Sequence, residues 1–417
     1  MTHTRSSTLS GYAIDWFREH DRESFLDLYA TVFDRQRTAE WFRWKYEANP
    51  YVDHVPIAVA RRQPSGTVVG CRAHFPLEVS VDDEAHLAFQ PCDTMVHPDH
   101  RRRGLFTAMN RWGLERYDDD GPAFFFNFPN AQAKPGNERL GWRPLGPVPM
   151  YYRVQNPVAV LARWLRAVDS TVDSRVPITA DSTGSAGSAD TNADSDSTDQ
   201  SATGETTGPT DAFARGLTSA VTTGHRLGDR LLARRSLRDA DVDVNVERYD
   251  LAPVGTLETL ARRSRLDGIR VRRSSTFYRW RLDNPLHEYV TVLARRADTG
   301  LPIAAMIVSP QDDHVRLVDA LPRGVDANDP AASALEYLLL AVLEAYQEKP
   351  FLTAFGDVLP DPLRYRFLPD TRAPLEPILR PTTRTLYARG LDDEVSRRLA
   401  SSTVDDWHLS RLDLDTT

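Results

Sequence analysis

The stretch Val-His-Pro-Asp-His-Arg-Arg-Arg-Gly-Leu-Phe, from Val96 to Phe106, decides the fold of this chain. An apolar run from Leu87 to Val96 precedes the three arginines, and apolar residues at helical spacing begin at Leu105. This order predicts a strand, a tight turn containing Gly104 and then the N-terminus of a helix. Such a turn presents free N–H groups and the positive end of the helix dipole. We therefore expect it to hold a phosphate group.

The spacing Arg101-x-x-Gly104-x-Phe106, after Val96-x-Pro98, resembles the cofactor signature of the GNAT superfamily of acetyl-CoA-dependent N-acetyltransferases. That signature is Arg/Gln-x-x-Gly-x-Gly/Ala, so Phe106 departs from it at a position that usually lacks bulk. We interpret Phe106 as a packing variant. The alternative interpretation of the same residues is a solvated basic helix start.

A second set of matches follows a predicted buried strand at 123–126, namely Asn130-x-x-Ala133, Asn137 and Gly141-Trp142. The next motif of the superfamily has Asn-x-x-Ala, a Tyr at the place of Asn137 and Gly-Phe at the place of Gly141-Trp142. Several matched features in order, on a strand–helix–strand background, are harder to obtain by chance than one motif. The resemblance covers residues 11–155.

The resemblance implies an α/β fold with a mixed sheet, acetyl-CoA as co-substrate and no metal. It implies that the pantetheine arm enters between two splayed strands, and that an N–H near a bulge in the fourth strand stabilises the oxyanion. Backbone N–H groups of the arginine turn would hold the diphosphate, with arginine side chains reaching outer phosphates. The cofactor-binding residues implied are Thr94, Met95, Val96, Arg101, Arg102, Arg103, Gly104, Leu105, Phe106, Thr107 and Asn130.

Asp93 is the candidate base, because members of the superfamily often hold a carboxylate at this place to take the proton of the amine. The alternatives are a carboxylate that orients a neighbouring side chain or one that faces solvent. His97 is interpreted as a turn residue. Asn137 stands where the superfamily has the Tyr that protonates the leaving thiolate, so Tyr151, Tyr152 or water is expected to substitute.

Composition favours an intracellular enzyme. The chain has 417 residues, enough for two domains, and its net charge of −8 argues against non-specific binding of nucleic acid by the whole protein. Lys45, Lys134 and Lys349 are the only lysines, which is typical of a salt-adapted or GC-rich source. Cys71 and Cys92 are expected to be reduced core thiols. No apolar run suggests export or a membrane span, so we expect a cytoplasmic protein.

Residues 169–211 consist almost entirely of Ser, Thr, Ala, Asp and Gly. Such a segment cannot bury enough surface to offset its ordering entropy, so it is predicted to be a flexible acidic linker. Apolar residues at helical spacing on both sides, at 158–168 and 227–232, predict flanking helices. Arg163 and Arg166 make the first flank basic and amphipathic, and packing is favoured there over binding to a membrane surface.

A repeat links the two halves of the chain. Residues 43–50, Arg-Trp-Lys-Tyr-Glu-Ala-Asn-Pro, are echoed at 279–285 by Arg-Trp-Arg-Leu-Asp-Asn-Pro, and Ala60-Arg61-Arg62 is echoed by Ala294-Arg295-Arg296. Gly66 and Gly300 follow at equal spacing, as hairpin turns would require. The pattern predicts an internal duplication. Because both copies keep the tryptophan and Asn-Pro, a structural role is favoured for Trp44 over stacking on an acceptor.

The second copy lacks the arginine turn. Its corresponding helix is entered through Asp326 and Asp329, and acidic caps would occupy the N–H groups that an anion needs. We therefore expect one cofactor site and a degenerate second GNAT-like half. The predicted organisation is residues 1–155, acetyltransferase domain; 156–240, flanking helices and linker; 241–395, degenerate domain; and 396–417, C-terminal tail.

Taken together, these patterns predict an N-acetyltransferase that moves an acetyl group from acetyl-CoA to a primary amine by direct attack. The acceptor stays open among polyamines, amino sugars, antibiotic amines and protein N-termini. A catalytically inactive CoA-binding or regulatory protein is the first alternative. A transferase that uses charged tRNA is the second, and the net negative charge and the intact arginine turn disfavour it.

Overall fold

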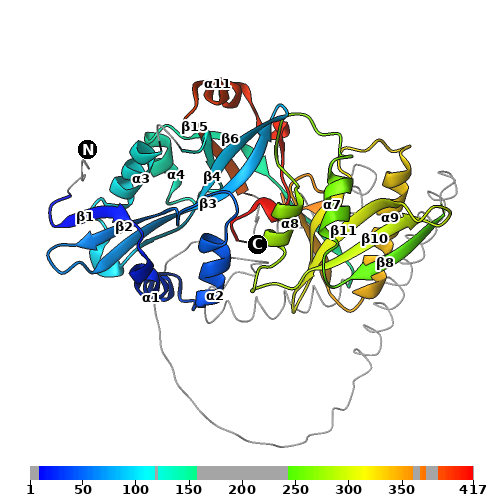
Figure 1. Ribbon diagram of the computed structural model, residues 1–417, viewed down its shortest axis with the longest axis horizontal. Helices are drawn as coiled ribbons and strands as arrows, with labels where there is room; N and C mark the ends of the chain where they lie inside the picture. Colours follow the sequence, from blue (N-terminus) through cyan, green and yellow to red (C-terminus); the bar gives the residue numbers. More distant parts are fainter. Residues whose placement is uncertain (1–8, 118–120, 157–242, 360–366, 372–383, 417) are drawn as a thin grey trace, which may run out of the picture.

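The computed structural model of the chain describes residues 9–117, 121–156, 243–359, 367–371 and 384–416 (Figure 1). Within these residues the strands form two mixed sheets, with helices against their faces. This agrees with the predicted α/β class. The predicted linker and both predicted flanking helices lie outside the described residues.

The first sheet has seven strands in a continuous path, with β9 (Ile269–Val271) and β16 (Trp407–His408) added beside β3. Strands β1 to β4 are antiparallel, β4 and β5 are parallel, and the remaining neighbours are antiparallel. In order across the sheet, the strands are β1 (Tyr12–Trp16), β2 (Ile57–Arg62), β3 (Val68–Val81), β4 (Glu84–Val96), β5 (Phe124–Asn127), β15 (Arg384–Gly390) and β6 (Arg143–Val148).

The second sheet repeats this pattern of directions, with its one parallel pair between β12 and β13. In order across the sheet, its strands are β8 (Val244–Tyr249), β10 (Val290–Arg296), β11 (Pro302–Pro310), β12 (Val315–Leu321), β13 (Phe351–Phe355), β7 (Met150–Val154) and β14 (Leu368–Pro369). The sixth place in each sheet is filled from the other half. Strand β7 lies between β13 and β14, and β15 lies between β5 and β6.

This exchange corrects two of the predicted boundaries. A division at residue 155 leaves Met150–Val154 with the first half, whereas β7 pairs with β13 of the second sheet. A division at residue 395 leaves Arg384–Gly390 with the second half, whereas β15 pairs with β5 and β6 of the first sheet. The two halves therefore exchange the strand at this position, and β9 and β16 of the second half also join the first sheet.

The helices fall into inner and outer groups (Figure 1). A central core between the two sheets joins α1 (Arg22–Phe33), α2 (Ala39–Phe42), α7 (Val254–Ala261) and α8 (Ser275–Arg281). On the outer face of the first sheet, α3 (Leu105–Arg116) packs on β2 and β3, and α4 (Lys134–Arg139) follows β5. On the second sheet, α9 (Pro330–Ala345) covers the outer face. The last helix, α11 (Asp393–Ser401), packs on β15 of the first sheet.

The repeated segments form the same local structures. Thr38 caps α2 by accepting the N–H of Trp41, and Ser274 caps α8 by accepting the N–H of Phe277. The π-helical turn η2 (Arg43–Glu47) continues α2. Both repeats therefore begin with a hydroxyl cap and bring a tryptophan to the centre of the molecule.

Trp44 and Trp280 make reciprocal contacts at the junction of the halves. The indole N–H of Trp44 donates to the carbonyl oxygen of Trp280 at 2.7 Å, and that of Trp280 donates to the carbonyl oxygen of Trp44 at 2.9 Å. Their rings are stacked with centroids 6.1 Å apart. Both side chains are buried, so the structural role favoured for Trp44 is what the structure shows.

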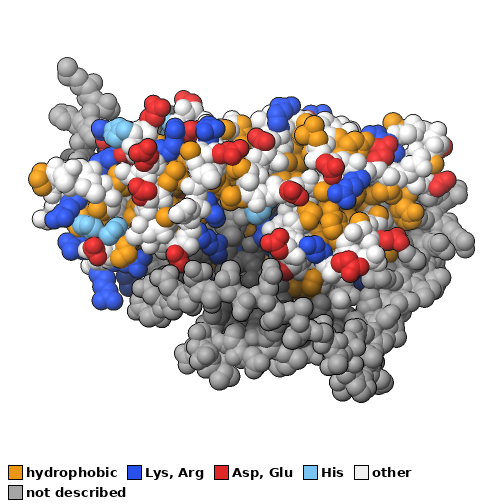
Figure 2. All heavy atoms as spheres, turned by 90° about the horizontal axis from the view of Figure 1, so that it is seen from below, with side chains coloured by type: hydrophobic (Ala, Val, Ile, Leu, Met, Phe, Trp, Pro, Cys, Tyr) orange, Lys and Arg blue, Asp and Glu red, His pale blue; other side chains and the backbone are white. Residues whose placement is uncertain are grey.

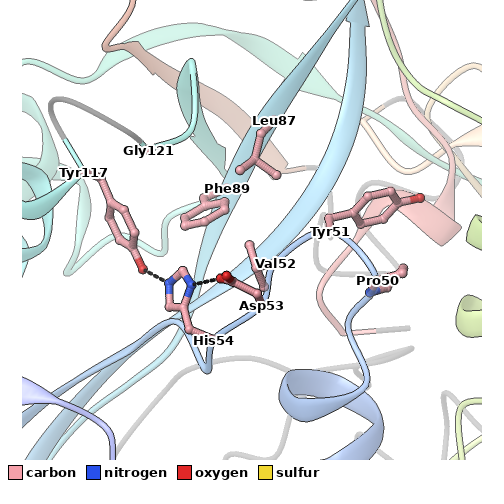
Figure 3. A pocket seen from close by; sticks show the side chains of 9 residues that line it. All are labelled: Pro50, Tyr51, Val52, Asp53, His54, Leu87, Phe89, Tyr117 and Gly121. Carbon is pink, nitrogen blue, oxygen red and sulfur yellow. Dashed lines mark hydrogen bonds and ion pairs between the residues drawn. The ribbon is translucent and has the colours of Figure 1, made fainter.

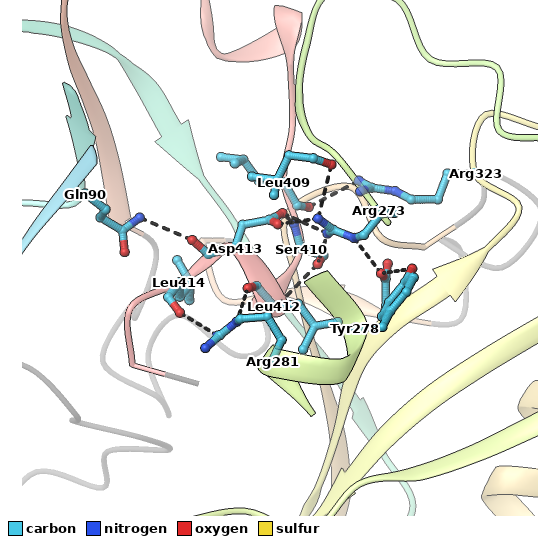
Figure 4. Close-up of polar contacts among 12 residues, drawn as sticks. Gln90, Arg273, Tyr278, Arg281, Arg323, Leu409, Ser410, Leu412, Asp413 and Leu414 are labelled. Carbon is cyan, nitrogen blue, oxygen red and sulfur yellow. Dashed lines mark hydrogen bonds and ion pairs between the residues drawn. The ribbon is translucent and has the colours of Figure 1, made fainter. Parts of the chain in front are cut away.

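The C-terminal segment (residues 407–415) is buried between the halves and is not a free tail (Figure 4). Arg273 binds the carboxylate of Asp413 and the hydroxyl of Ser410, while Arg281 donates to the carbonyl oxygens of Leu412 and Leu414, each at 2.9 Å. These bonds satisfy backbone groups that would otherwise be buried without a partner. The predicted tail at 396–417 is therefore a packed part of the fold.

Candidate functional site

The arginine turn lies between β4 and α3, as predicted. A single 3-10 turn, η3 (Pro98–His100), leads into it, and α3 begins at Leu105 without a side-chain cap. Arg102 and Gly104 both have left-handed backbone conformations, with φ of 61° and 78°. Glycine adopts this conformation without strain, whereas at Arg102 it costs about 1 kcal/mol.

The N–H groups from Arg102 to Thr107 form no hydrogen bond with the part of the chain that the structure describes. Two arginine side chains instead brace the turn. Arg101 donates to the carbonyl oxygen of Val96 at 3.3 Å, and Arg103 donates to the hydroxyl of Tyr12 and the carbonyl oxygen of Asp99, each at 3.2 Å. Successive free N–H groups at a helix N-terminus form a concave donor surface that suits an anion.

The equivalent helix of the second half is closed to an anion. Asp329 caps α9 by accepting the N–H of Ala331 at 2.9 Å, and Pro330 at the first helical position has no N–H. Asp326 lies beside Arg265 with 3.4 Å between the charged atoms. The chain thus holds an uncapped and a capped version of the same helix start.

Strands β4 and β5 separate beside the turn, and we call the gap between them the splay. They pair only at Ala88 with Phe124 and at Phe89 with Phe125, and no pairing continues toward Val96. In the separated part, β4 has a bulge, because Cys71 lies opposite Met95 while Ala73 lies opposite Cys92. A bulge of this kind redirects N–H groups out of the ladder.

The bulge consists of Asp93 and Thr94, and both lie opposite Arg72 of β3. Asp93 has a φ of 39°, so its backbone is strained, and such strain is common at functional sites. The predicted site residues Thr94, Met95 and Val96 therefore lie at the mouth of the splay. They run directly into the arginine turn.

Phe106 spans the gap between α3 and α4. Its ring lies so close to Gly136 that a Cβ atom at that glycine would be 3.0 Å from it. The same ring lies 5.7 Å from the guanidinium of Arg72. The bulk of Phe106 is thus accommodated by a glycine on the opposite helix, which is what a packing variant requires.

Asp93 belongs to a buried ionic group on the inner face of the sheet. Its carboxylate accepts from Lys45 Nζ at 2.6 Å and from the hydroxyl of Tyr46. Lys45 also lies 3.5 Å from Asp415 of the C-terminal segment. Burial alone would lower the pKa of Lys45, but the two carboxylates outweigh burial and raise it well above its usual range. Asp93 therefore orients a lysine, and a role as base stays a prediction.

The remaining predicted residues are not gathered at the turn. Asn130 uses its side-chain oxygen to accept the N–H of Ala133 at 2.8 Å, so it shapes the start of α4. Asn137 is buried, and its side-chain oxygen has no partner in the described residues. Tyr151 lies on β7 in the second sheet and packs against the core beneath α9. The structure thus does not bring Tyr151 to Asp93, and we no longer assign it as the acid.

Sequence reasoning missed three residues of this site: Lys45, Tyr46 and Arg72. Arg72 is a charge in a largely apolar segment, but this pattern alone does not indicate what the side chain faces. Lys45 and Tyr46 precede Asp93 by 48 and 47 residues, and no local pattern links them.

A cavity of about 480 Å³ lies apart from the splay (Figure 3). Leu87 and Phe89, at the paired end of β4, line it together with the loop from Pro50 to His54. His54 Nε2 lies 3.2 Å from the hydroxyl of Tyr117 at its edge. Because β4 is closed against β5 here, this cavity is separate from the arginine turn.

In the described residues no group of three or more His, Cys, Asp or Glu could hold a metal ion. The two cysteines are buried and free, as expected. No helix in the described part of the chain is long and apolar enough to cross a membrane. On the face drawn in Figure 2, acidic and basic side chains are interspersed.

Comparison with known proteins identifies the first half. A family model described as an acetyltransferase (GNAT) domain matches residues 14–145, a range that contains the turn, the bulge and the splay. Residues 14–145 form a GNAT domain. No curated protein matches the chain at the level of sequence.

Solved structures share the fold at low sequence identity. A GCN5-related N-acetyltransferase from Kribbella flavida has a TM-score of 0.54 and 13% identity, over 91% of this chain and 71% of that one. One from Anabaena variabilis has a TM-score of 0.53 and 8% identity, over 91% and 73%. Saccharomyces cerevisiae N-myristoyltransferase, solved with bound myristoyl-CoA, has a TM-score of 0.52 and 12% identity, over 93% and 81%. The chain thus shares the overall fold of these proteins.

Proposed function

We propose that the chain is an N-acyltransferase that moves an acetyl group from acetyl-CoA to a primary amine. The observation that carries this proposal is the row of free N–H groups from Arg102 to Thr107, placed at the mouth of the splay between β4 and β5. The capped start of α9 argues for one such site, in the GNAT domain, and for a second half that binds no CoA.

The residues present fit the co-substrate. The N–H groups of Gly104, Leu105 and Phe106 would hold the diphosphate, and the exposed Arg102 side chain would reach outer phosphates. CoA supplies the acyl group as a thioester, which is activated toward an amine. Backbone N–H groups of the bulge, between Thr94 and Val96, would stabilise the oxygen that becomes negative when the amine attacks.

The inner side of β4 supports an approach for the amine. Asp93 faces this side with Lys45 and Tyr46, whereas Arg72 and Phe106 lie on the outer side toward α3. An amine that enters beside Asp93 can pass its proton to this carboxylate or to water. Positioning of the amine and stabilisation of the oxyanion can together lower the activation barrier by several kcal/mol.

The test is release of free thiol from acetyl-CoA in the presence of a panel of polyamines, amino sugars, antibiotic amines and peptides. Amine-dependent release is expected, with acetylated product seen by mass spectrometry. A parallel series of longer acyl-CoA donors defines the acyl group. CoA binding without thiol release across the panel would favour the alternative, a catalytically inactive CoA-binding or regulatory protein, to which Asn137 in place of Tyr lends some support. The cytoplasmic location and the absence of nucleic-acid partners stay predictions.

A further inference from the structure

Among the residues that the structure describes, no carboxylate forms an ion pair with the buried cation Arg72. The residue is 4% exposed, and its one hydrogen bond goes to the hydroxyl oxygen of Thr94, 2.6 Å from Nη1. Its Nε has no acceptor among the described residues. Burial lowers the pKa of Arg72 to about 10, so the side chain is still a cation at neutral pH. A buried charge without a counter-ion is unfavourable unless something compensates it.

Three other arginines with buried side chains are compensated. Arg273 forms ion pairs with Asp319 and Asp413, and Arg323 forms one with Asp357. Arg281 has no carboxylate but donates to two carbonyl oxygens of the C-terminal segment. Arg72 has a single neutral acceptor and retains free donor capacity.

The place of Arg72 coincides with the site proposed above. It lies opposite the bulge of Asp93 and Thr94, next to the separated part of β4 and β5. Phe106, the second residue of α3, covers the guanidinium at 5.7 Å from its ring centroid. The charge thus lies between the arginine turn and the bulge, on the side of the sheet that faces α3.

The repeat provides an internal comparison. Arg72 pairs with Ala58 of β2, and the corresponding residue of β10, Val292, pairs with Met306 of β11. Met306 is fully buried beneath α9. The half with the uncapped helix therefore has arginine at this position, and the half with the capped helix has methionine. A purely structural need of the fold would not require a charge here, because the second half is built without one.

We propose that Arg72 stabilises the negative charge on the thioester sulfur as the thiolate leaves, in place of the phenol that is absent at Asn137. The inference rests on the proposed transferase function. As the N–C bond forms, the C–S bond breaks and its electron pair stays on sulfur. The amine proton passes to Asp93 or to water. Arg72 donates hydrogen bonds and gives up no proton, and the thiolate takes one from solvent after release.

The test measures the thiol of bound CoA, so it needs no acceptor. Thiolate absorbance is followed as pH rises, with CoA that lacks its sulfur as the blank. In the unaltered protein the pKa of the bound thiol should lie about one to three units below that of free CoA. In Arg72→Met it should return to the free value, and in Arg72→Lys it should stay partly lowered. Arg72→Met is a matched change, because Met306 already occupies the equivalent place.

Kinetics separate this role from a structural one. With any amine that supports turnover, Arg72→Met should lower kcat by about 10²–10³ and leave KM for acetyl-CoA nearly unchanged. With an acyl donor whose thiol is more acidic, Arg72→Met should lower kcat by a smaller factor. An equal loss for both donors, or a bound thiol whose pKa is the same in Arg72→Met, would overturn the inference and leave the proposed function standing. Failure of CoA to bind to the unaltered protein would overturn both.

Discussion

His74 illustrates how burial of a single residue couples this fold to pH. It lies on the outer face of β3, with its ring 5.6 Å from those of Tyr117 and Phe125. Its Nδ1 lies 3.1 Å from the carbonyl oxygen of Pro56, which fits a donated hydrogen bond. Burial, with the charge of Arg72 adding to it, lowers the pKa of His74 to about 3. His74 is therefore neutral in the folded protein at any pH above that value.

Acid should thus destabilise the protein through His74. The unfolded chain binds a proton near the ordinary histidine pKa of about 6.5, but the folded chain does not until about pH 3. The contribution of neutral His74 to stability is present above about pH 6.5 and is lost as the pH falls toward 3. We expect the loss from this residue to be about 2 kcal/mol between pH 7 and pH 5, measured by chemical denaturation.

His74→Phe is the matched control for that prediction. The carbonyl oxygen of Pro56 still accepts the backbone N–H of residue 74, at 3.0 Å, so no buried acceptor is left unsatisfied. Between pH 7 and pH 5, the free energy of unfolding of His74→Phe should fall by about 2 kcal/mol less than that of the unaltered protein. An acid dependence identical to that of the unaltered protein would show that His74 is not the group responsible.

Single residues were predictable where a repeat constrained them. The tryptophans of the two copies were expected to be structural, and Trp44 and Trp280 indeed bond to each other. The environment of Asp93 was not predictable, because Lys45 reaches Asp93, and Asp415 reaches Lys45, through tertiary packing from distant parts of the sequence. Arg72 was missed because a charge in an apolar strand, taken alone, carries no information on what it faces.

At the scale of the element, α3 and its preceding turn set the function. Gly104 has a φ of 78°, and a Cβ atom there would have one neighbour within 4 Å, at 3.9 Å. Gly104→Ala is therefore a test of backbone conformation and not of crowding. We expect Gly104→Ala to lower the free energy of unfolding by about 1 kcal/mol. We also expect it to weaken CoA binding, measured by calorimetry. An alanine would relax out of the left-handed conformation and turn the N–H groups away from the diphosphate.

Gly300 provides the matched control in the second half. It has a φ of 69° in the hairpin between β10 and β11, with nothing within 4 Å of an added Cβ. Gly300→Ala should cost similar stability and leave CoA binding unchanged. Equal weakening of CoA binding by both substitutions would mean that the effect comes from general destabilisation.

Much of this element was predictable from spacing. A strand, a glycine turn and a helix were expected between Leu87 and Trp112, and β4, the turn and α3 occupy that range. The acidic cap at Asp329 was expected and is present. The left-handed backbone of Arg102 was not expected, because arginine has no preference for it and only the surrounding turn imposes it.

At the scale of the whole molecule, the exchange of β7 and β15 makes the halves interdependent. Without β15, the first sheet loses the strand between β5 and β6, and without β7 the second loses the strand between β13 and β14. Each half alone would leave sheet edges and core residues exposed.

Fragments 1–156 and 243–417 should therefore fold only together. When they are produced together, we expect them to co-purify and to unfold in one cooperative transition. Produced singly, each should lack a cooperative transition in thermal denaturation. A cooperative transition in either fragment alone would contradict the interdependence of the halves.

The exchange could not be predicted from the sequence. The repeat indicated two copies of one fold, and the two sheets do share one order of strand directions. Nothing local in Met150–Val154 or Arg384–Gly390 distinguishes a strand that stays in its own sheet from one that crosses. The choice depends on the central core, where Trp44, Trp280 and the C-terminal segment hold the halves close together.

The central claim is that the free N–H groups that open α3 bind the diphosphate of CoA. A crystal structure of the protein with CoA tests it most directly. We predict diphosphate oxygens within hydrogen-bond distance of the N–H groups between Arg102 and Thr107, with the pantetheine arm entering the splay between β4 and β5. A diphosphate bound elsewhere, or a turn that keeps these N–H groups free while CoA is bound, would contradict the account.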